Sequence, residues 1–211
     1  MAYDFKKEEK ALYNPKAEPS LLTVPPMRFL AVEGKGNPND PEGAYSEAVQ
    51  TLYTLSYTIK MSKMGEAELP GFFDYTVPPL EGLWWMEGGA PGVDFQNKAG
   101  FCWIAMIRQP DFVTEEVLDW AKAEAKRKKG ADCGKGKLMI YDEGLCVQCM
   151  HIGAYDDEPA TVAAMDAFLA ENGYENDMEN GRRHHEIYLG NPRTTEVSKR
   201  KTILRHPVRK K

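Results

Sequence analysis

Apolar and polar positions follow two different periods along this chain, and together they predict an α+β fold. Apolar residues recur at helical spacing in segments 43–63, 114–129 and about 156–172. Other segments are rich in β-branched and aromatic residues and are bounded by Gly, Pro or Asp, which is typical of strands. The predicted strands are 27–33, 80–87, 101–107, 138–141, 145–152, 184–189 and 201–207, with 72–77 as a further strand or hairpin arm.

The order of these elements indicates an internal duplication of plan, although not of sequence. A strand, a helix and two strands follow one another in a first unit at about 27–108 and again in a second unit at about 145–207. The segment at about 110–142, with its helix, connects them, and residues 1–20 form a loosely attached arm before a single domain at 21–211. Two such units that shared a sheet edge would enclose a cleft on their pseudo-twofold axis, where pockets commonly form.

Composition places the chain among soluble globular proteins and narrows its compartment. Its 211 residues are 42% hydrophobic and carry a formal net charge of −5. No apolar run reaches the roughly 20 residues that a membrane helix needs, and residues 1–10 lack a signal-peptide core. Cys102, Cys133, Cys146 and Cys149 are too few and too irregularly spaced for a disulfide framework. We therefore expect a cytoplasmic protein with reduced thiols and no membrane contact.

The basic C-terminal segment could in principle bind nucleic acid. Residues 193–211 hold eight Lys or Arg and one Glu. Strand-forming residues interrupt these charges, so we favour a solvated edge strand whose charges oppose aggregation. The acidic body of the chain also argues against nucleic-acid binding.

The sequence gives little support to a metal site, a redox site or the active site of a common hydrolase. Cys146 and Cys149 form a Cys-x-x-Cys within a strand, where positions i and i+3 face opposite ways, so we interpret them as buried apolar residues. His184 and His185 also face opposite ways, and His151 is interpreted as a hydrogen-bonded core or edge residue. Neither a Gly-x-Ser-x-Gly elbow nor a dinucleotide fingerprint occurs. We predict no metal and no cofactor.

The run 184–189 contains the candidate reactive group. Side chains at i and i+2 share one face of a strand, so His184, Glu186 and Tyr188 point one way and the apolar Ile187 and Leu189 the other. The apolar face belongs in a core. The polar face belongs either in water or in a ligand cavity, where Glu186 could act as a general base or balance a cationic ligand.

Aromatic residues gather in and beside the two predicted units. Core filling is their default use, but adjacent tryptophans in a strand face opposite ways, so one of Trp84 and Trp85 must lie at a surface or cavity wall. An aromatic-walled cavity suits flat, hydrophobic or cationic ligands. The candidate ligand-binding residues are Trp84, Trp85, Trp103, Tyr155, Tyr57 and Tyr53.

Four segments resemble the GyrI-like small-molecule-binding family, and in particular a stand-alone subfamily that includes hydrolases of cyclopropane-bearing, DNA-alkylating toxins. These segments are 80–85, 143–153, 155–159 and 185–192. The resemblance implies two strand-helix-strand-strand units about a pseudo-twofold axis, with antiparallel sheets and a central ligand cleft. It also implies that Glu186 lies in the cleft, where it hydrates the strained ring, with Tyr188 as a second catalytic candidate. Many relatives carry a helix-turn-helix, for which this sequence has no pattern.

Two functions follow from this resemblance. The first is hydrolysis of hydrophobic, electrophilic small molecules, with water activated by Glu186. The alternative is a non-catalytic binder or sensor of aromatic or cationic small molecules that acts through a protein partner such as gyrase or a regulator. Both use the same cavity, so the sequence leaves open whether the protein is an enzyme.

Overall fold

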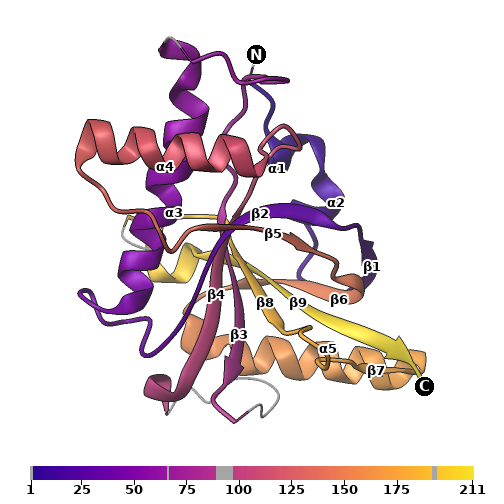
Figure 1. Cartoon of the computed structure of the whole chain (residues 1–211). Coiled ribbons are helices and arrows are strands. Elements are labelled where there is room, and N and C mark those ends of the chain that lie inside the picture. Colours follow the sequence, from indigo (N-terminus) through magenta and orange to yellow (C-terminus); the bar gives the residue numbers. More distant parts are fainter. Residues whose placement is uncertain (1, 66, 89–96, 192–193) are drawn as a thin grey trace.

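The computed structural model describes residues 2–65, 67–88, 97–191 and 194–211 (Figure 1). The loop at 88–92, which the sequence predicts to be flexible, lies almost entirely outside these residues. Within them, no helix is long and apolar enough to cross a membrane.

One antiparallel sheet organises the described part of the chain. Its strands are ordered β1-β6-β9-β8-β3-β4-β2-β5, and β7 pairs with β9 outside this path. The strands are β1 Ser20–Val24, β2 Met27–Lys35, β3 Leu80–Met86, β4 Phe101–Arg108, β5 Lys137–Tyr141, β6 Gly144–Ile152, β7 Tyr174–Asn176, β8 His184–Tyr188 and β9 Lys201–Lys210. The predicted strand at 72–77 does not form, and Tyr75 makes only an isolated bridge to Tyr3.

The helices are α1 Phe5–Glu8, α2 Lys10–Tyr13, α3 Ala44–Lys60, α4 Glu115–Lys129 and α5 Glu158–Asn172. Local sequence sets the ends of the two later ones. The Thr114 hydroxyl accepts a hydrogen bond from the Val117 amide at the start of α4, and Gly130 ends that helix in the left-handed conformation. Pro159 lies in the first turn of α5, and Gly173 ends it in the same way.

The strand order confirms the predicted duplication. β2-α3-β3-β4 and β6-α5-β8-β9 have the same sequence of elements, and β2-β4-β3 mirrors β6-β9-β8 across the sheet. β3 and β8 pair at the centre, where Gly82 lies opposite Glu186. β5 beside β2 and β1 beside β6 extend the mirrored order to the two edges. The α+β fold with a pseudo-twofold axis is therefore as predicted.

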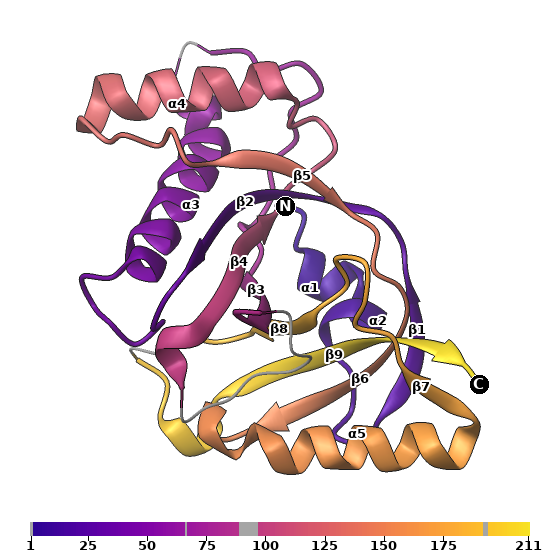
Figure 2. The ribbon, with the colours of Figure 1, turned by 60° about the horizontal axis from the view of Figure 1, so that its bottom comes forward.

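Alternate residues of the strands supply two faces of the sheet. Leu30 of β2 packs with α3 and α4, while its neighbour Phe29 packs with Phe5 of α1 on the other side. In the second unit, Leu204 of β9 packs with α5 and Ile203 packs with the α1–α2 side. The two long helices α3 and α5 thus cover one face, and the N-terminal segment lies against the other, within the curve of the sheet (Figure 2).

The N-terminal segment is more firmly attached than the sequence suggests. Phe5, Leu12 and Tyr13 are buried, and Arg108 forms an ion pair with Glu9 at 2.7 Å. The segment continues into β1, which pairs with β6. Apolar residues in a short, proline-interrupted stretch have no clear period, which is why these elements could not be predicted.

The interpretation of β9 as a solvated edge strand is wrong. β9 lies between β6 and β8, and Arg205 and His206 are buried. The Arg205 guanidinium contacts Glu143 at 3.3 Å and donates to the Leu12 carbonyl at 2.8 Å. A charge that has such partners can lie in the interior, so the basic character of β9 did not indicate exposure.

Candidate functional site

A cavity of about 1250 Å³ lies on the α3–α5 face of the sheet. Tyr45, Tyr53 and Tyr57 of α3 line one side, and Tyr155, just before α5, lines another. Its volume is somewhat above the range of about 300–1,000 Å³ that is usual for small-molecule sites, and aromatic walls with few charges are typical of such sites.

The central strand pair contributes Trp84, Glu186 and Tyr188 to the cavity wall. Leu80 lies opposite Tyr188 and Trp84 opposite His184, so the alternate residues of β3 and β8 present one face. The Trp84 indole N–H donates to the Tyr188 hydroxyl over 3.0 Å. A Cβ on Gly82 would lie 2.6 Å from that indole nitrogen, so the indole occupies the space that a side chain at position 82 would need.

The Tyr188 hydroxyl keeps its proton at this wall. Burial, followed by the charge of Glu186, raises the pKa of its hydroxyl well above the usual value, and the hydroxyl is hydrogen-bonded to the Glu186 carboxylate. Tyr155 packs edge-on against Tyr188 with ring centroids 5.7 Å apart, and Tyr45 lies 5.2 Å from Trp84. These rings keep bulk water away from Glu186, which is 7% exposed.

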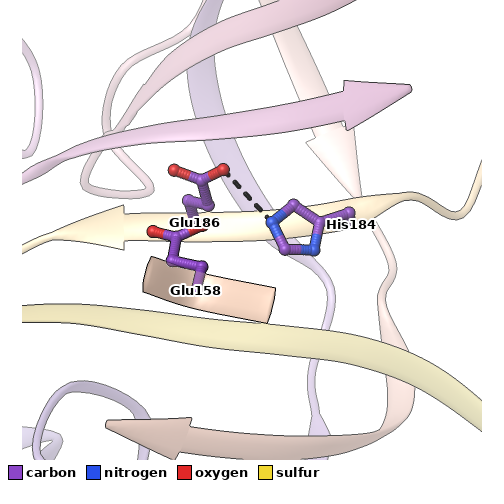
Figure 3. A group of neighbouring side chains, drawn as sticks. All are labelled: Glu158, His184 and Glu186. Atoms are coloured by element: carbon purple, nitrogen blue, oxygen red, sulfur yellow. Dashed lines mark hydrogen bonds and ion pairs between the residues drawn. The ribbon is translucent and has the colours of Figure 1, made fainter. Parts of the chain in front are cut away.

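Behind Glu186 runs a chain of buried polar side chains from β8 and β9, of which Figure 3 shows Glu186 and His184. The Glu186 carboxylate lies 3.1 Å from Nε2 of His184, and Nδ1 of His184 lies 2.6 Å from Nε2 of His206. Burial and the neighbouring His184 lower the pKa of His206 to about 3, so His206 is neutral at physiological pH. Nδ1 of His184 and Nε2 of His206 thus contact each other, and this contact fixes the orientation of the His184 ring toward Glu186.

Glu158, the first residue of α5, adds a second carboxyl group to this cluster (Figure 3). It is fully buried, and neither of its oxygens has a hydrogen-bond partner among the described residues. Burial raises its pKa to about 10, and the negative charges of Glu186 and Asp156 contribute in the same direction. Burial thus disfavours the charged form of this carboxyl group.

Glu158, His184 and Glu186 are also a grouping that could hold a metal ion, because one potential ligand atom from each lies within 4.8 Å of the others. A nitrogen and two carboxylate oxygens suit several divalent metals. The sequence predicted no metal site, and the grouping was missed because Glu158 is 26 positions from His184 along the chain. The fold brings them together because the first residue of α5 lies beside β8 (Figure 3).

The predicted ligand-binding residues divide into two groups. Trp84, Tyr53, Tyr57 and Tyr155 line the cavity, as do Glu186 and Tyr188. Trp85 and Trp103 are not among the lining residues. Trp85 faces the other side of β3, where the Arg183 guanidinium lies 5.1 Å from its ring. Trp103 is buried beneath α3, with its ring 5.0 Å from that of Tyr45.

Tyr45 is a cavity residue that sequence reasoning missed. Its position within the predicted helix 43–63 indicates only that it lies on the apolar face of that helix. Tyr45, Val49, Tyr53 and Tyr57 nevertheless recur every four positions, which places them in one row along α3, and all four line the cavity. This row in the sequence is the signal from which Tyr45 could have been predicted to line the cavity.

Comparison with known proteins agrees with this architecture. Residues 17–209 match the model of the GyrI-like small molecule binding domain. The chain belongs to this family. Two solved hydrolases from Listeria innocua are similar to this GyrI-like protein over nearly its whole length. One is 49% identical with a TM-score of 0.89, and covers 98% of this chain and 100% of its own. The other, encoded by lin2189, is 50% identical with a TM-score of 0.91, and covers 99% and 100%.

A more distant structure shows the same fold alone. The EcmrR C-terminal domain is 12% identical with a TM-score of 0.53, and the match covers 92% of this chain and 98% of that domain. A search of curated proteins gave no match. The GyrI-like protein is thus a small-molecule-binding domain, and its near relatives are described as hydrolases.

Proposed function

We propose that this GyrI-like protein hydrolyses hydrophobic, electrophilic small molecules, in particular cyclopropane-bearing alkylating toxins, and that Glu186 activates the attacking water. The observation that carries this proposal is a carboxylate that is 7% exposed at the wall of an aromatic cavity. At that position the carboxylate can accept a proton from a water molecule bound in the cavity.

Aromatic side chains hold the substrate. A flat conjugated ring system packs between Trp84 of the sheet and the tyrosine row of α3, which lie on adjoining walls of the cavity. Such stacking contributes about 0.5–1.5 kcal/mol per ring pair beyond the area buried. Tyr53 and Tyr57 already lie 6.2 Å apart at 27° and extend this surface toward the outside.

The chemical step is the addition of water across a strained C–C bond. Glu186 accepts a proton from water, and the resulting hydroxide oxygen bonds to the cyclopropane methylene. The broken C–C bond leaves its electron pair on the conjugated carbonyl oxygen, which takes a proton from Tyr188. The proton on Glu186 then passes to Tyr188 through their hydrogen bond, so the net change is the addition of one water molecule.

The similarity to the two Listeria innocua hydrolases supports a hydrolytic reaction rather than binding alone. The choice of a cyclopropane-bearing substrate is supported by the resemblance of segments 80–85, 143–153, 155–159 and 185–192 to the GyrI-like family and its stand-alone subfamily that includes toxin hydrolases. The cavity volume of about 1250 Å³ is large enough for a polycyclic ligand of this class.

Glu186→Gln tests the proposal. We expect the variant to bind a cyclopropanoid dienone with an affinity close to that of the wild type, as measured by quenching of tryptophan fluorescence. We expect hydrated product, quantified by mass spectrometry, to form about 10²–10⁴-fold more slowly, because the general base is lost. Glu87→Gln, at an exposed ion pair with Lys35, is the matched control and should turn over normally.

Undiminished turnover by the Glu186→Gln variant would contradict this mechanism. If the wild type protects DNA from the alkylating compound only stoichiometrically and forms no product, the protein is a binder or sensor instead.

A further inference from the structure

The mechanism above uses Glu186 but gives no role to Glu158, although Glu158 is fully buried. Glu158 is the first residue of α5, and its side chain lies beside those of His184 and Glu186 (Figure 3). Neither of its carboxyl oxygens has a hydrogen-bond partner within the part of the chain that the structure describes. Buried carboxyl groups in proteins are normally hydrogen-bonded, paired with a cation or bound to a metal ion. The position of Glu158 therefore indicates a positively charged partner.

Glu158, His184 and Glu186 offer one nitrogen and two oxygens at a spacing close to that of metal ligands. One potential ligand atom from each lies within 4.8 Å of the others. Bonds from a metal to nitrogen or oxygen are about 2.0–2.2 Å long, so two ligand atoms of one ion lie about 3–4 Å apart. Nε2 of His184 and Oε1 of Glu186 already have this spacing at 3.1 Å. A small shift of the Glu158 carboxyl group, at the end of a flexible side chain, completes the set.

The orientation of His184 suits a metal ligand. Its Nδ1 lies 2.6 Å from Nε2 of the buried His206, so Nε2 is the nitrogen that faces the carboxyl groups. A histidine ligand usually holds its other nitrogen in a hydrogen bond of this kind, which fixes the ring in place. His184 and Glu186 are two positions apart in β8, so the strand presents both on one face. The fold therefore holds two of the three ligands in position.

Charge and donor type narrow the kind of ion. Two ionised carboxyl groups carry two negative charges, which a divalent ion balances in a buried site. One imidazole nitrogen with two carboxylate oxygens suits Zn²⁺ and the related ions Mn²⁺, Fe²⁺ and Co²⁺. Ca²⁺ takes about six to eight oxygen ligands and Mg²⁺ requires a near-octahedral set of oxygens, which these three side chains do not supply.

We propose that Glu158, His184 and Glu186 bind one divalent transition-metal ion, of which Zn²⁺ is the representative. Glu186 lines the cavity and Glu158 does not, so the ion lies at the inner side of the cavity wall. A further consequence rests on the proposed function. A carboxylate that shares its charge with a divalent ion is a weaker base, so metal binding to Glu186 opposes the hydrolysis of substrate. Metal binding itself does not depend on any enzymatic activity.

Equilibrium dialysis of the purified protein, freed of any purification tag, tests the site. We expect the wild type, first stripped with a chelator, to bind one Zn²⁺ per chain, and equimolar Mg²⁺ not to displace it. Glu158→Gln removes a charged ligand and should weaken Zn²⁺ binding at least about 100-fold, because the loss of a residue behind a ligand already costs about 10–100-fold. Glu171→Gln, at an exposed position of the same helix, is the matched control and should bind as the wild type does.

Co²⁺ in place of Zn²⁺ identifies the ligand atoms. Co²⁺ bound by nitrogen and oxygen absorbs visible light only weakly, whereas a thiolate ligand adds an intense charge-transfer band. We expect no such band, which distinguishes the proposed site from binding at the partly exposed Cys102.

Turnover of the cyclopropanoid dienone tests the consequence for the base. Saturating Zn²⁺ should slow the wild type at least about tenfold, and a chelator should restore the rate. Equal rates with and without bound Zn²⁺ would show that Glu186 is not a ligand and would overturn the inference.

Three results of the binding experiments would also overturn it: a wild type that binds no Zn²⁺, equal Zn²⁺ affinity in the Glu158→Gln variant, or a thiolate band with Co²⁺. The dialysis and the Co²⁺ spectrum of the wild type decide the matter if the variant fails to fold. Zn²⁺ binding as expected, in a protein that has no turnover even after chelation, would reject the proposed function and leave this inference intact.

Discussion

The Trp84 indole rests on the backbone of its own strand because residue 82 has no side chain. On one face of β3, positions 82 and 84 are neighbours, and the indole leans toward the glycine until its nitrogen reaches the Tyr188 hydroxyl. The strand pairing places Gly82 directly opposite Glu186. A single missing side chain therefore allows an aromatic ring, a phenol and a carboxylate to meet at one point of the cavity wall.

Gly82→Ala tests this arrangement. The new methyl group would lie 2.6 Å from the Trp84 indole nitrogen and 3.2 Å from the Tyr188 hydroxyl, so the indole must move and its hydrogen bond must break. We expect a loss of about 1–3 kcal/mol in the free energy of unfolding. We also expect the variant to bind the cyclopropanoid dienone more weakly in a fluorescence titration. The dissociation constant should rise about tenfold for each 1.4 kcal/mol of stacking free energy that is lost.

Gly65→Ala is the matched control, since its Cβ would make only an ordinary contact of 3.5 Å with a backbone oxygen. Dienone affinity equal to that of the wild type in the Gly82→Ala variant would show that the position of the indole does not matter for binding.

At the scale of the elements, the sequence predicts nearly every strand and helix that builds the two units, because their apolar periods are long and regular. It predicts that His184, Glu186 and Tyr188 share a face, since this follows from alternation alone. It does not predict that both faces of β8 are buried. His185 on the other face lies 3.0 Å from Glu143, in the turn between β5 and β6, and 2.9 Å from Glu81 of β3, and both partners are far from it in the sequence.

The same limit explains the error on β9 and the omission of Glu158. Arg205 and Glu158 are charged residue types that usually lie in solvent, so their local patterns indicate exposure. Tertiary structure brings their neighbours to them: Glu143 pairs with Arg205, and His184 and Glu186 lie near Glu158. Pairings of this kind have no local period and could not be inferred from one sequence.

Glu143→Gln tests whether the buried ion cluster holds β8, β9 and the N-terminal segment together. Glu143 is fully buried and contacts both His185 and Arg205. Its loss leaves the buried Arg205 guanidinium without a carboxylate partner and His185 with Glu81 alone, so we expect a decrease of about 3–5 kcal/mol in the free energy of unfolding at pH 6. Glu196→Gln breaks an exposed pair with Lys199 and should cost less than about 1 kcal/mol.

The pH dependence of this loss follows from the two pKa values. Burial opposes the charge of His185, but Glu143 raises its pKa to about 9, so the contact stabilises fully below about pH 6.5 and is lost as the pH rises through 9. Burial likewise opposes the charge of Glu143, but His185 and Arg205 lower its pKa to about 2, so the contact is lost as the pH falls through 2. A difference in urea stability between wild type and variant that is constant from pH 5 to pH 10 would contradict this assignment.

For the whole molecule, the duplicated plan raises the question of whether the two units fold separately. Each has its own helix packed on its own strands, yet one apolar cluster crosses the boundary. That cluster joins Phe5 of the N-terminal segment, Phe29 and Met106 of the first unit, and Met150 and Ile203 of the second. The central β3–β8 pairing adds a continuous hydrogen-bonded ladder, so neither unit has a core that is complete without the other.

We therefore expect a single cooperative unfolding transition. Trp84, Trp85, Trp103 and Trp120 all precede residue 144, so tryptophan fluorescence reports only on the first unit and the connecting helix. Amide hydrogen exchange of β6 and β9 reports on the second. Because both units share the cluster, the free energy of opening obtained for the β6 and β9 amides should equal that from fluorescence-detected urea unfolding. If the β6 and β9 amides instead exchange through a transition at clearly lower urea, the second unit unfolds alone. The cavity could then lose the wall that bears Glu186 while the first unit stays folded.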